Sequence, residues 1–347
     1  MAFLTPLEIF GLLFFTSGPG WRVWRPDDEP LSLNKDDPGC RPGTLPGALS
    51  GLNLSYPGES PLTVPMCLFH SRNMISDSIH ATGRWHDCGA LVAAWRSLRP
   101  SPRFLMLEVG GNIGACSMEV LLRTDARLII FEPSFTNLYY LTRTLQAAHR
   151  HSPHLDLAHR VVVFPIGLGN ESSSTELFAD TANSGDSIVV GRGEPSATST
   201  ASRRHTYRSQ GFVTIHPLDE LMPPEADPHA STTPPGSSTA YSTAVHGRVP
   251  VHVPLMKIDV QGYECRALQG MHRLLTSRAL GAIFTEVSLP HLARAGCSQQ
   301  GLLDLLNLHD YQVKNPNGPR GHWSWDILAR LISDNTQGGS RVPSAGV

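Results

Sequence analysis

Residues 105–114 read LMLEVGGNIG, in which a short apolar run passes into a turn of the form Glu108-x-Gly110-x-x-x-Gly114. The apolar run predicts a buried strand, and the residues after the turn predict a helix. Glycine lets the chain turn sharply and lets a ligand approach the backbone, because no Cβ stands in the way. A helix that begins after such a turn presents free N–H groups and a partial positive charge to that ligand. The stretch therefore predicts a strand, a ligand-binding loop and a helix in succession.

A nicotinamide dinucleotide site requires a different glycine spacing. Its fingerprint G-x-G-x-x-G, when it ends on Gly114, needs glycine at positions 109 and 111. Position 111 is glycine, but position 109 is Val109. The turn therefore argues against a nicotinamide-dependent oxidoreductase, which stays an alternative.

A second acidic residue, Glu132, follows the next apolar run in the string RLIIFEP. An acidic side chain about 20 positions after a glycine loop can accept hydrogen bonds from the two hydroxyls of a ribose. The alternative is an acid that caps a helix beginning at Pro133, since proline favours the first helical turn. We favour ribose binding because the glycine loop is in register with Glu132.

A third group of charged residues lies in LMKIDVQGYE, residues 255–264. Lys257, Asp259 and Glu264 surround the carboxyl end of this predicted strand, which is the side where ligands bind in open α/β sheets. Burial of a charged side chain is costly unless it is paired or binds something. We expect these three residues to form the catalytic group, with a structural Lys257–Asp259 pair as the alternative.

Short apolar runs alternate with longer helical segments from Arg103 onward. The first five runs are near-continuous apolar stretches rather than alternating ones, as expected for strands that are covered on both faces. This rhythm predicts an α/β fold with a mostly parallel sheet and helices on both faces. The predicted strands are 104–109, 128–131, 161–166, 255–260, 282–287, 311–314 and 325–331, and the predicted helices are 113–123, 135–148, 264–277 and 299–309.

The composition divides the chain into regions. Residues 1–62 are rich in Pro, Gly, Asp and Ser and are expected to be irregular or poorly ordered. Residues 63–100 are expected to form a small helical module, with Asp87 capping a helix over 88–98. The α/β domain is expected over 101–331, with a low-complexity insertion at 192–250 and a disordered tail at 332–347.

Charge and composition bear on the partners and the compartment. Of the 347 residues, 40% are hydrophobic and 17% are charged, and the net charge of −2 gives no basic face, so no nucleic-acid partner is expected. The apolar segment 9–15 is far shorter than the ~20 residues of a membrane span. It also lacks the basic start of a secretory signal. We therefore expect a soluble protein, with the cytoplasm slightly favoured over the secretory pathway.

The six cysteines form no CxxC pair and no Cys/His metal spacing, so no metal site is expected. Cys116 and Cys265 lie inside predicted helices, where a buried thiol is the ordinary interpretation. Cys67 and Cys88 bracket the small module and can pair in an oxidising compartment, so this pairing stays open.

Taken together, these strings resemble the FkbM family of methyltransferases from about Phe104 to Val313. The resemblance rests on LEVGGNIG, the FEP of 131–133 with Asn137 behind it, VFPIGLGN, the NSGDS of 183–187, the Leu218-Asp219 pair, KIDVQGYE and the TEV of 285–287. Order and spacing agree apart from the insertion between Gly191 and Val251. The family pattern usually has Asp at position 108 and Glu at position 261, where this chain has Glu108 and Gln261. The second departure removes a carboxylate.

The resemblance implies a Rossmann-like class I methyltransferase fold and transfer of a methyl group from S-adenosylmethionine to an oxygen, often a hydroxyl of a sugar or natural product. A small-molecule or glycan acceptor is therefore the expected partner, facing the strand ends near Asp259 and Glu286. Because a hydroxyl is a weak nucleophile at neutral pH, a nearby base should help. Asp259 is the first candidate, with His216 and His252 behind it. The residues that we expect to hold the cofactor are Glu108, Gly110, Asn112, Gly114, Glu132, Pro133, Asn137 and Asp186.

Another alternative is a non-catalytic relative that keeps the fold as a binding or scaffolding module. The loss of a carboxylate at Gln261 keeps this alternative open, and a turnover assay separates it from an enzyme. Trp323 and Trp325 are expected to pack the last strand, with a stacking platform for substrate as the minority interpretation.

Overall fold

The computed structural model describes residues 17–18, 21–29, 47–54, 62–69, 73–100, 104–183, 185–190, 206–222, 252–314, 316–319 and 321–332. The expected apolar segment at 9–15, most of the expected insertion and nearly all of the expected tail lie outside these residues. None of the helices in the described part is long and apolar enough to cross a membrane.

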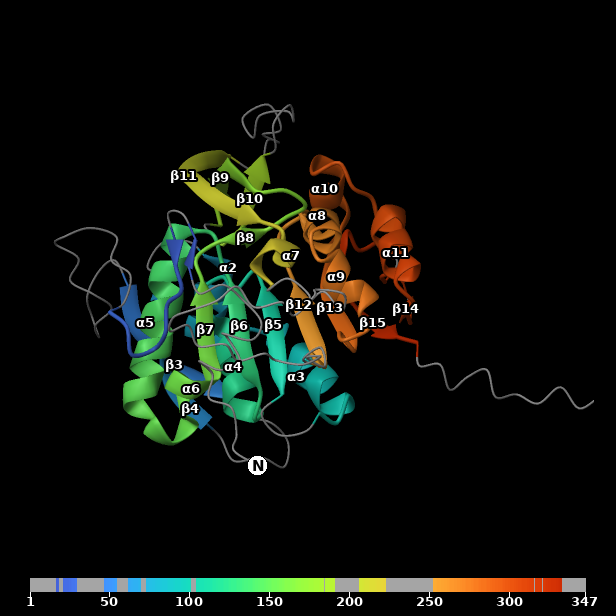
Figure 1. Ribbon diagram of the computed structural model, residues 1–347. Helices are drawn as coiled ribbons and strands as arrows, with labels where there is room; N and C mark the ends of the chain where they lie inside the picture. The colour runs from blue at the N-terminus through green and yellow to red at the C-terminus, as the bar shows by residue number, and fades with distance from the viewer. Residues whose placement is uncertain are drawn as a thin grey trace, which may run out of the picture.

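A seven-stranded sheet forms the centre of the molecule (Figure 1). Across the sheet its order is β14-β15-β13-β12-β5-β6-β7, and only β15 runs antiparallel to its neighbours. The sheet is therefore mostly parallel, as predicted for this α/β fold class. The strands are β5 (Leu105–Val109), β6 (Arg127–Phe131), β7 (Val161–Phe164), β12 (Leu255–Ile258), β13 (Ala282–Ser288), β14 (Tyr311–Val313) and β15 (Ser324–Leu331).

Helices cover both faces of this sheet because successive side chains of a strand point to opposite sides. Met106 of β5 joins one hydrophobic core, whereas Leu105 and Leu107 join the other. On the Met106 side pack α2 (Met74–Thr82), α3 (Cys88–Ser97), α4 (Ala115–Arg123), α5 (Phe135–His151) and α6 (Leu157–Arg160), the last preceded by a 3-10 turn, η1 (Pro153–Leu155). On the other side pack α7 (Leu218–Leu221), α8 (Glu264–Gln269), α9 (His272–Thr276), α10 (Leu289–Arg294) and α11 (Gln299–Leu308).

The predicted helix over 264–277 is divided into α8 and α9 at Gly270. A Cβ at Gly270 would lie 1.8 Å from the carbonyl oxygen of Gly169. The two backbones therefore approach each other so closely that only glycine fits. This approach packs the break between the helices against the backbone directly after the short strand Gly167–Leu168.

A second, four-stranded sheet lies beyond the carboxyl ends of β6 and β7, at the top of Figure 1. Its order is β10-β9-β11-β8, and β11 pairs antiparallel with β9 over most of its length. The strands are β8 (Gly167–Leu168), β9 (Ser173–Asp180), β10 (Ser187–Val190) and β11 (Tyr207–His216). Part of the expected low-complexity insertion is therefore an ordered strand.

The region before residue 100 contains strands that the sequence did not predict. Short strands β1 (Ser17–Gly18) and β2 (Trp21–Arg22) pair with each other, as do β3 (Gly47–Leu54) and β4 (Leu62–Phe69). The Cys67 N–H in β4 donates a 3.0 Å hydrogen bond to Thr144 Oγ1 of α5. Residues of β4, α2 and α3 belong to the same hydrophobic core as α4 and α5.

Disulfides correct the expectations for the cysteines. Cys88 is bonded to Cys116, with Cα atoms 4.7 Å apart, and Cys265 is bonded to Cys297. Cys67 is also disulfide-bonded, so the open pairing of Cys67 with Cys88 is wrong, as is the interpretation of Cys116 and Cys265 as free thiols. The sequence pattern misses the Cys88–Cys116 bond because the two cysteines are 28 positions apart in the chain. They meet only because the starts of α3 and α4 lie side by side in the fold.

Candidate functional site

The glycine loop after β5 lies against the end of β12. A Cβ at Gly110 would lie 1.9 Å from the carbonyl oxygen of Asp259, and the φ angle of Gly110 is +90°. Both facts require glycine. The close approach places the loop of residues 110–114 beside Asp259, as expected for two strand ends on one edge of a parallel sheet.

Glu132 holds this loop from the end of β6. Its Oε2 accepts a 2.7 Å hydrogen bond from the Asn112 N–H, and its Oε1 accepts from the Ser134 N–H and from Asn137 Nδ2. Burial raises the pKa of Glu132 to about 7, although the hydrogen bonds from Ser134, Asn112 and Asn137 lower it. Oε2 has one described donor, so it retains capacity to accept another.

A cavity opens between this loop and the second sheet. Its lining combines polar and apolar side chains, which suits a ligand that has both a polar and an aromatic part. Its lining includes Gly110, Asn112, Glu132, Pro133 and Asn137 from the expected cofactor residues, together with Leu168, Leu177, Val189 and Ile215 from the second sheet.

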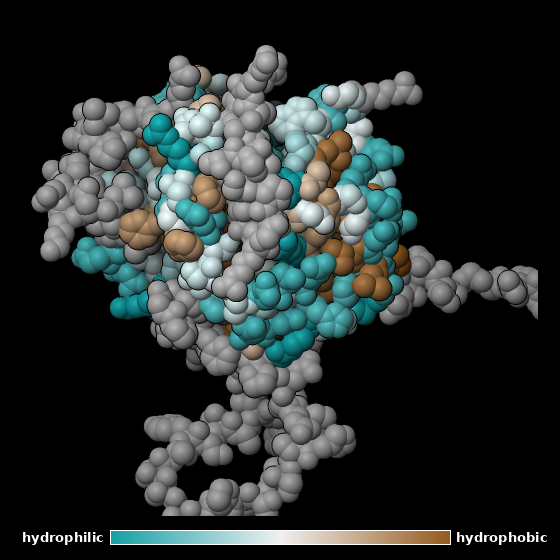
Figure 2. Space-filling model, turned by 90° about the horizontal axis from the view of Figure 1, so that it is seen from above, coloured by the Kyte–Doolittle hydropathy of each residue, from teal (hydrophilic) through white to brown (hydrophobic). Residues whose placement is uncertain are grey.

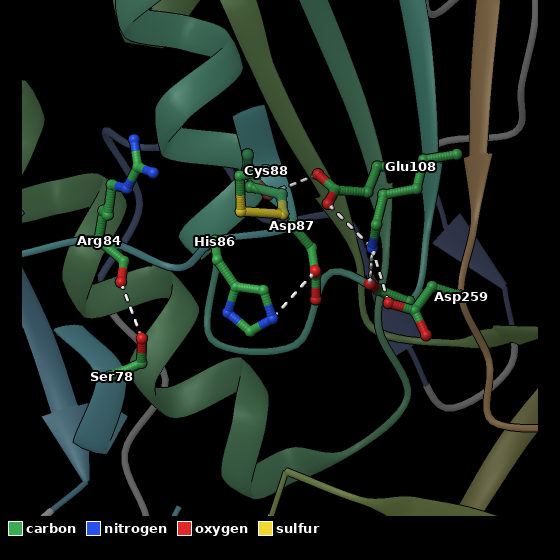
Figure 3. Close-up of a disulfide and its surroundings, with 11 residues drawn as sticks. Ser78, Arg84, His86, Asp87, Cys88, Glu108 and Asp259 are labelled. Atoms are coloured by element: carbon green, nitrogen blue, oxygen red, sulfur yellow. Dashed lines mark hydrogen bonds and ion pairs between the residues drawn. A yellow bond between two sulfur atoms is a disulfide. The ribbon is translucent and has the colours of Figure 1, made fainter. Parts of the chain in front are cut away.

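Lys257 is a buried cation of the site, and it lies between Glu108 and Asp259, the two carboxylates that Figure 3 labels at the strand ends. Its Nζ lies 3.3 Å from Asp259 Oδ2 and 3.6 Å from Glu108 Oε1, and it donates to the carbonyl oxygen of Gly110 at 3.2 Å. Burial lowers the pKa of Lys257, but Asp259 and Glu108 more than offset this and raise it. Lys257 therefore stays a cation and orients Asp259 rather than taking up a proton.

Gln261 connects two carboxylates. Its Nε2 donates to Asp259 Oδ1 at 2.9 Å and to Glu286 Oε2 at 3.2 Å. Burial and the nearby Asp259 raise the pKa of Glu286 to about 8, while a hydrogen bond from Ser324 lowers it. The amide at this position therefore supplies a donor that a glutamate would lack.

A larger cavity of about 960 Å³ adjoins the first one. Asn112, Gly185, Asp259 and Gln261 line both cavities, so the two meet at these residues. The remaining polar lining includes His86, Asp87, Asp180, Asp186, Lys257, Glu286, His291, Arg294 and Asp326, and the aromatic lining is Trp85, Tyr207, Phe284, Trp323 and Trp325. Figure 2 views this end of the molecule, where hydrophilic residues surround smaller patches of hydrophobic ones.

Three expected site residues line neither cavity. Glu108 is 1% exposed and accepts a 2.6 Å hydrogen bond from Ser117 Oγ. From this buried position it forms the ion pair with Lys257. Gly114 forms the turn before α4. Glu264 Oε1 accepts from the N–H groups of Val260 and Gly262, and burial raises its pKa to about 7. Glu264 thus caps the turn after β12.

The two histidines named as further bases also lie elsewhere. His216 Nδ1 is 2.6 Å from Ser172 Oγ in the second sheet, and the His252 ring packs edge-on against Phe104 near the amino end of β5. Neither residue lines either of the two cavities described above.

His86 and Asp87 line the larger cavity, although the sequence did not indicate them as site residues. Asp87 stands at the start of α3 as expected, but its side chain makes no capping hydrogen bond and faces this cavity instead. The only signal was the string WHD at 85–87, in which three polar or aromatic groups precede a helix. Trp323, expected to be packed, is 62% exposed.

No family model matches this chain, and no curated protein matches it. The chain is similar to solved structures of methyltransferases. One is precorrin-6y C5,15-methyltransferase from Geobacter metallireducens GS-15, at 12% identity over 77% of this chain and 94% of that chain, with a TM-score of 0.34. Another is a SAM-dependent O-methyltransferase from Thermotoga maritima, at 12% identity over 92% and 95%, with a TM-score of 0.32. Magnesium protoporphyrin IX methyltransferase from Synechocystis PCC 6803 has 7% identity over 75% and 85%, with a TM-score of 0.35.

Proposed function

We propose that this protein is a methyltransferase that uses S-adenosylmethionine. The observation that carries the proposal is the junction of the two cavities. The glycine loop and Glu132 line the smaller cavity, and Asp259 and Gln261 line both. A cofactor in the smaller cavity would therefore present a transferable group to an acceptor in the larger one.

The residues of the smaller cavity fit the cofactor. A ribose hydroxyl can donate to Glu132 Oε2, which still has a free acceptor position. The apolar side chains of Leu168, Leu177 and Ile215 offer a surface for an aromatic base. Close approach of the rest of the cofactor to the loop is possible at Gly110, where a Cβ would fill the space.

We further propose that the acceptor is a hydroxyl of a sugar or a related polyol, as in the FkbM family. Among the described residues, the larger cavity is lined by six carboxylates, namely Asp87, Asp180, Asp186, Asp259, Glu286 and Asp326. Carboxylates accept hydrogen bonds from hydroxyls. The cavity lining also includes Trp85, Trp323 and Trp325, whose faces suit the apolar side of a sugar ring. Its excess of negative charge disfavours anionic acceptors.

The contribution of the protein to this reaction would be mainly positioning. S-Adenosylmethionine supplies a methyl group on a sulfonium leaving group. Asp259, held by Lys257 and Gln261, can accept a hydrogen bond from the acceptor hydroxyl and orient its oxygen for in-line attack.

The disulfides favour an oxidising compartment over the cytoplasm that the sequence slightly favoured. Cys88–Cys116 and Cys265–Cys297 both lie in the described part of the chain. Disulfides persist in oxidising compartments and are rare in the cytoplasm. Assays therefore begin without reductant.

Two measurements test the proposal. In calorimetric titration, S-adenosylmethionine and S-adenosylhomocysteine should bind saturably and NADH should not. In a second assay, S-adenosylmethionine with a radiolabelled methyl group is incubated with methyl glycosides of glucose, galactose, mannose and xylose, and label should move into the sugar fraction. Failure of a folded protein to bind either cofactor form contradicts the methyltransferase proposal. Binding without transfer to any glycoside contradicts the proposed acceptor class.

A further inference from the structure

The turn between β8 and β9 contains the tripeptide Asn170-Glu171-Ser172. An asparagine that is followed by any residue except proline, and then by serine or threonine, is the acceptor signal for an N-linked glycan. Such glycans are added in the secretory pathway, which is an oxidising compartment. The two disulfides described above favour a compartment of this kind. The signal and the cysteine chemistry therefore agree.

His216 holds both ends of this turn. The Gly169 N–H donates to the carbonyl oxygen of His216 at 3.1 Å, and Ser172 Oγ lies 2.6 Å from His216 Nδ1. Ser172 Oγ also donates to Glu220 Oε2 of α7. The chain is thus held against the end of β11 on both sides of Asn170, so this asparagine occupies a defined place on the surface.

Asn170 itself is exposed, as is Glu171 beside it. Surface turns of this kind are where N-linked glycans are carried, because a bulky hydrophilic group there displaces no packed side chain. Residues 170–172 line neither of the two cavities. A glycan on Asn170 would therefore extend into solvent and leave the cofactor and acceptor cavities open.

A second tripeptide of the same form, Asn53-Leu54-Ser55, occurs earlier in the chain. Asn53 lies within β3, where its backbone is paired with Thr63 of β4. Ser55 lies outside the described residues. Because acceptor asparagines are typical of surface loops rather than of paired strands, the structure favours Asn170 of the two.

We propose that Asn170 carries an N-linked glycan. This inference rests on the oxidising compartment proposed above and does not depend on methyl transfer. The donor is an oligosaccharide linked to a lipid diphosphate, and the oligosaccharide transferase of the secretory pathway is the catalyst.

The glycan is attached through the side-chain amide. Asn170 Nδ2 forms a bond to the anomeric carbon of the first sugar and loses one proton to solvent. The bond from that carbon to the diphosphate oxygen breaks, and its electron pair leaves with the lipid diphosphate. No group is oxidised or reduced. Transfer takes place on the nascent chain, before Ser172 Oγ engages His216 and Glu220.

The test is made on two samples, the protein isolated from its natural source with an antibody and the full chain secreted by cultured eukaryotic cells behind a cleavable leader. Peptide N-glycosidase in heavy-oxygen water converts a glycosylated asparagine to a labelled aspartate, which mass spectrometry locates. We expect label at Asn170 in most molecules of both samples. Asn307 is also exposed but is followed by leucine and histidine, so it should stay unlabelled and measures spontaneous deamidation.

Variants of the secreted chain identify the signal. Asn170→Gln and Ser172→Ala should abolish the label at position 170 and increase the electrophoretic mobility of the untreated protein. Ser172→Thr should keep the label, since threonine also satisfies the signal. Asn53→Gln should leave the label at Asn170 unchanged. Label at Asn170 that persists in Ser172→Ala would show deamidation rather than a glycan and would overturn the assignment.

The two samples separate the possible failures. A folded, secreted chain without label at Asn170 overturns the site itself. Label in the secreted chain but not in the natural protein overturns the compartment, and with it the proposal. Neither result depends on activity, so a failure of the methyltransferase proposal is recognised separately in the glycoside assay. In that assay, Asn170→Gln should keep kcat within twofold of the wild-type value, because its turn lines neither cavity.

Discussion

The Asn112 N–H donates a 2.7 Å hydrogen bond to Glu132 Oε2, which ties the glycine loop to the end of the neighbouring strand. Glu132 thus shapes the loop and, in our proposal, also binds the ribose. Glu132→Ala should weaken binding of S-adenosylhomocysteine by about 10- to 100-fold, since hydrogen bonds to charged groups contribute ~1.5–3 kcal/mol. Calorimetry measures this loss. Glu119→Gln, at a buried glutamate that lines neither cavity, should bind normally. Equal weakening in both variants would contradict the role of Glu132.

Cofactor affinity should increase with pH near neutrality. Burial raises the pKa of Glu132 to about 7, against the lowering effect of its hydrogen-bond donors. Ribose hydroxyls donate better to the ionised carboxylate, so binding below pH 7 must first release a proton. The Kd should therefore rise by roughly tenfold between pH 8 and pH 6. Titrations in buffers of different ionisation enthalpy would detect the proton release, and a Kd that is constant over this range would refute the linkage.

Glu119 should make stability depend on pH. It is 1% exposed in α4, and among the described residues neither carboxylate oxygen has a hydrogen-bond partner. Burial raises its pKa to about 7 despite the nearby Arg123. A folded-state pKa above the unfolded value favours the protonated fold, so stability is fully present below about pH 4.5 and decreases as the pH rises to about 7.

Glu119→Gln should therefore raise the free energy of unfolding at pH 8 by up to about 3 kcal/mol, and change it little at pH 4.5. Urea denaturation at both pH values measures the difference. The control is Glu171→Gln, which changes an exposed glutamate and should have no effect at either pH. A gain that is equal at both pH values would point to packing rather than to ionisation.

Gly110→Ala should abolish cofactor binding. The new Cβ would meet the carbonyl oxygen of Asp259 at 1.9 Å, and φ is +90°. Gly211→Ala is the matched control, because Gly211 has a φ of +93° but a Cβ added there would meet no described atom within 4 Å. It should lose only the ~1–2 kcal/mol of a left-handed residue and keep its cofactor affinity. If the two variants behave alike, backbone strain rather than contact with Asp259 explains the loss.

Gln261→Glu would introduce a glutamate at the position where the FkbM pattern usually has one, and we expect it to lower methyl transfer here. The change removes the donor shared by Asp259 and Glu286 and adds a third carboxylate beside them. We expect kcat to fall by about tenfold, because like charges in one site raise each other's pKa. Gln261→Met removes the donor without adding charge and should have a smaller effect. Higher kcat in Gln261→Glu would refute this.

The large sheet could be predicted from the sequence because its central strands, β5, β6, β7, β12 and β13, are short, mostly apolar and buried runs. The second sheet could not, because β9 and β11 are largely polar and half-exposed, and they pair across a segment of low complexity. The break at Gly270 depends on contact with Gly169, which lies 101 positions earlier in the chain. No local pattern reports such a contact.

The candidate site also has one part that local sequence patterns predict and one part that depends on contacts between distant segments. Gly110, Glu132 and Asp259 stand at the ends of predicted strands, so their convergence follows from the topology of a parallel sheet. His86 and Asp87 reach the site through the packing of α3 against α4, which pattern alone does not specify. The cysteines show the same limit, since Cys88 and Cys116 belong to two segments that the sequence assigned to different modules.

The position of β15 has a consequence for the order in which the protein folds. β15 lies between β13 and β14, although it comes after both in the chain. Until residues 324–331 have been synthesised, β13 exposes an unpaired edge and β14 has no partner in the sheet. Exposed strand edges pair readily with other chains. The nascent protein therefore passes through a stage in which this edge is open to aggregation, and a chaperone that covers β13 would raise its folding yield.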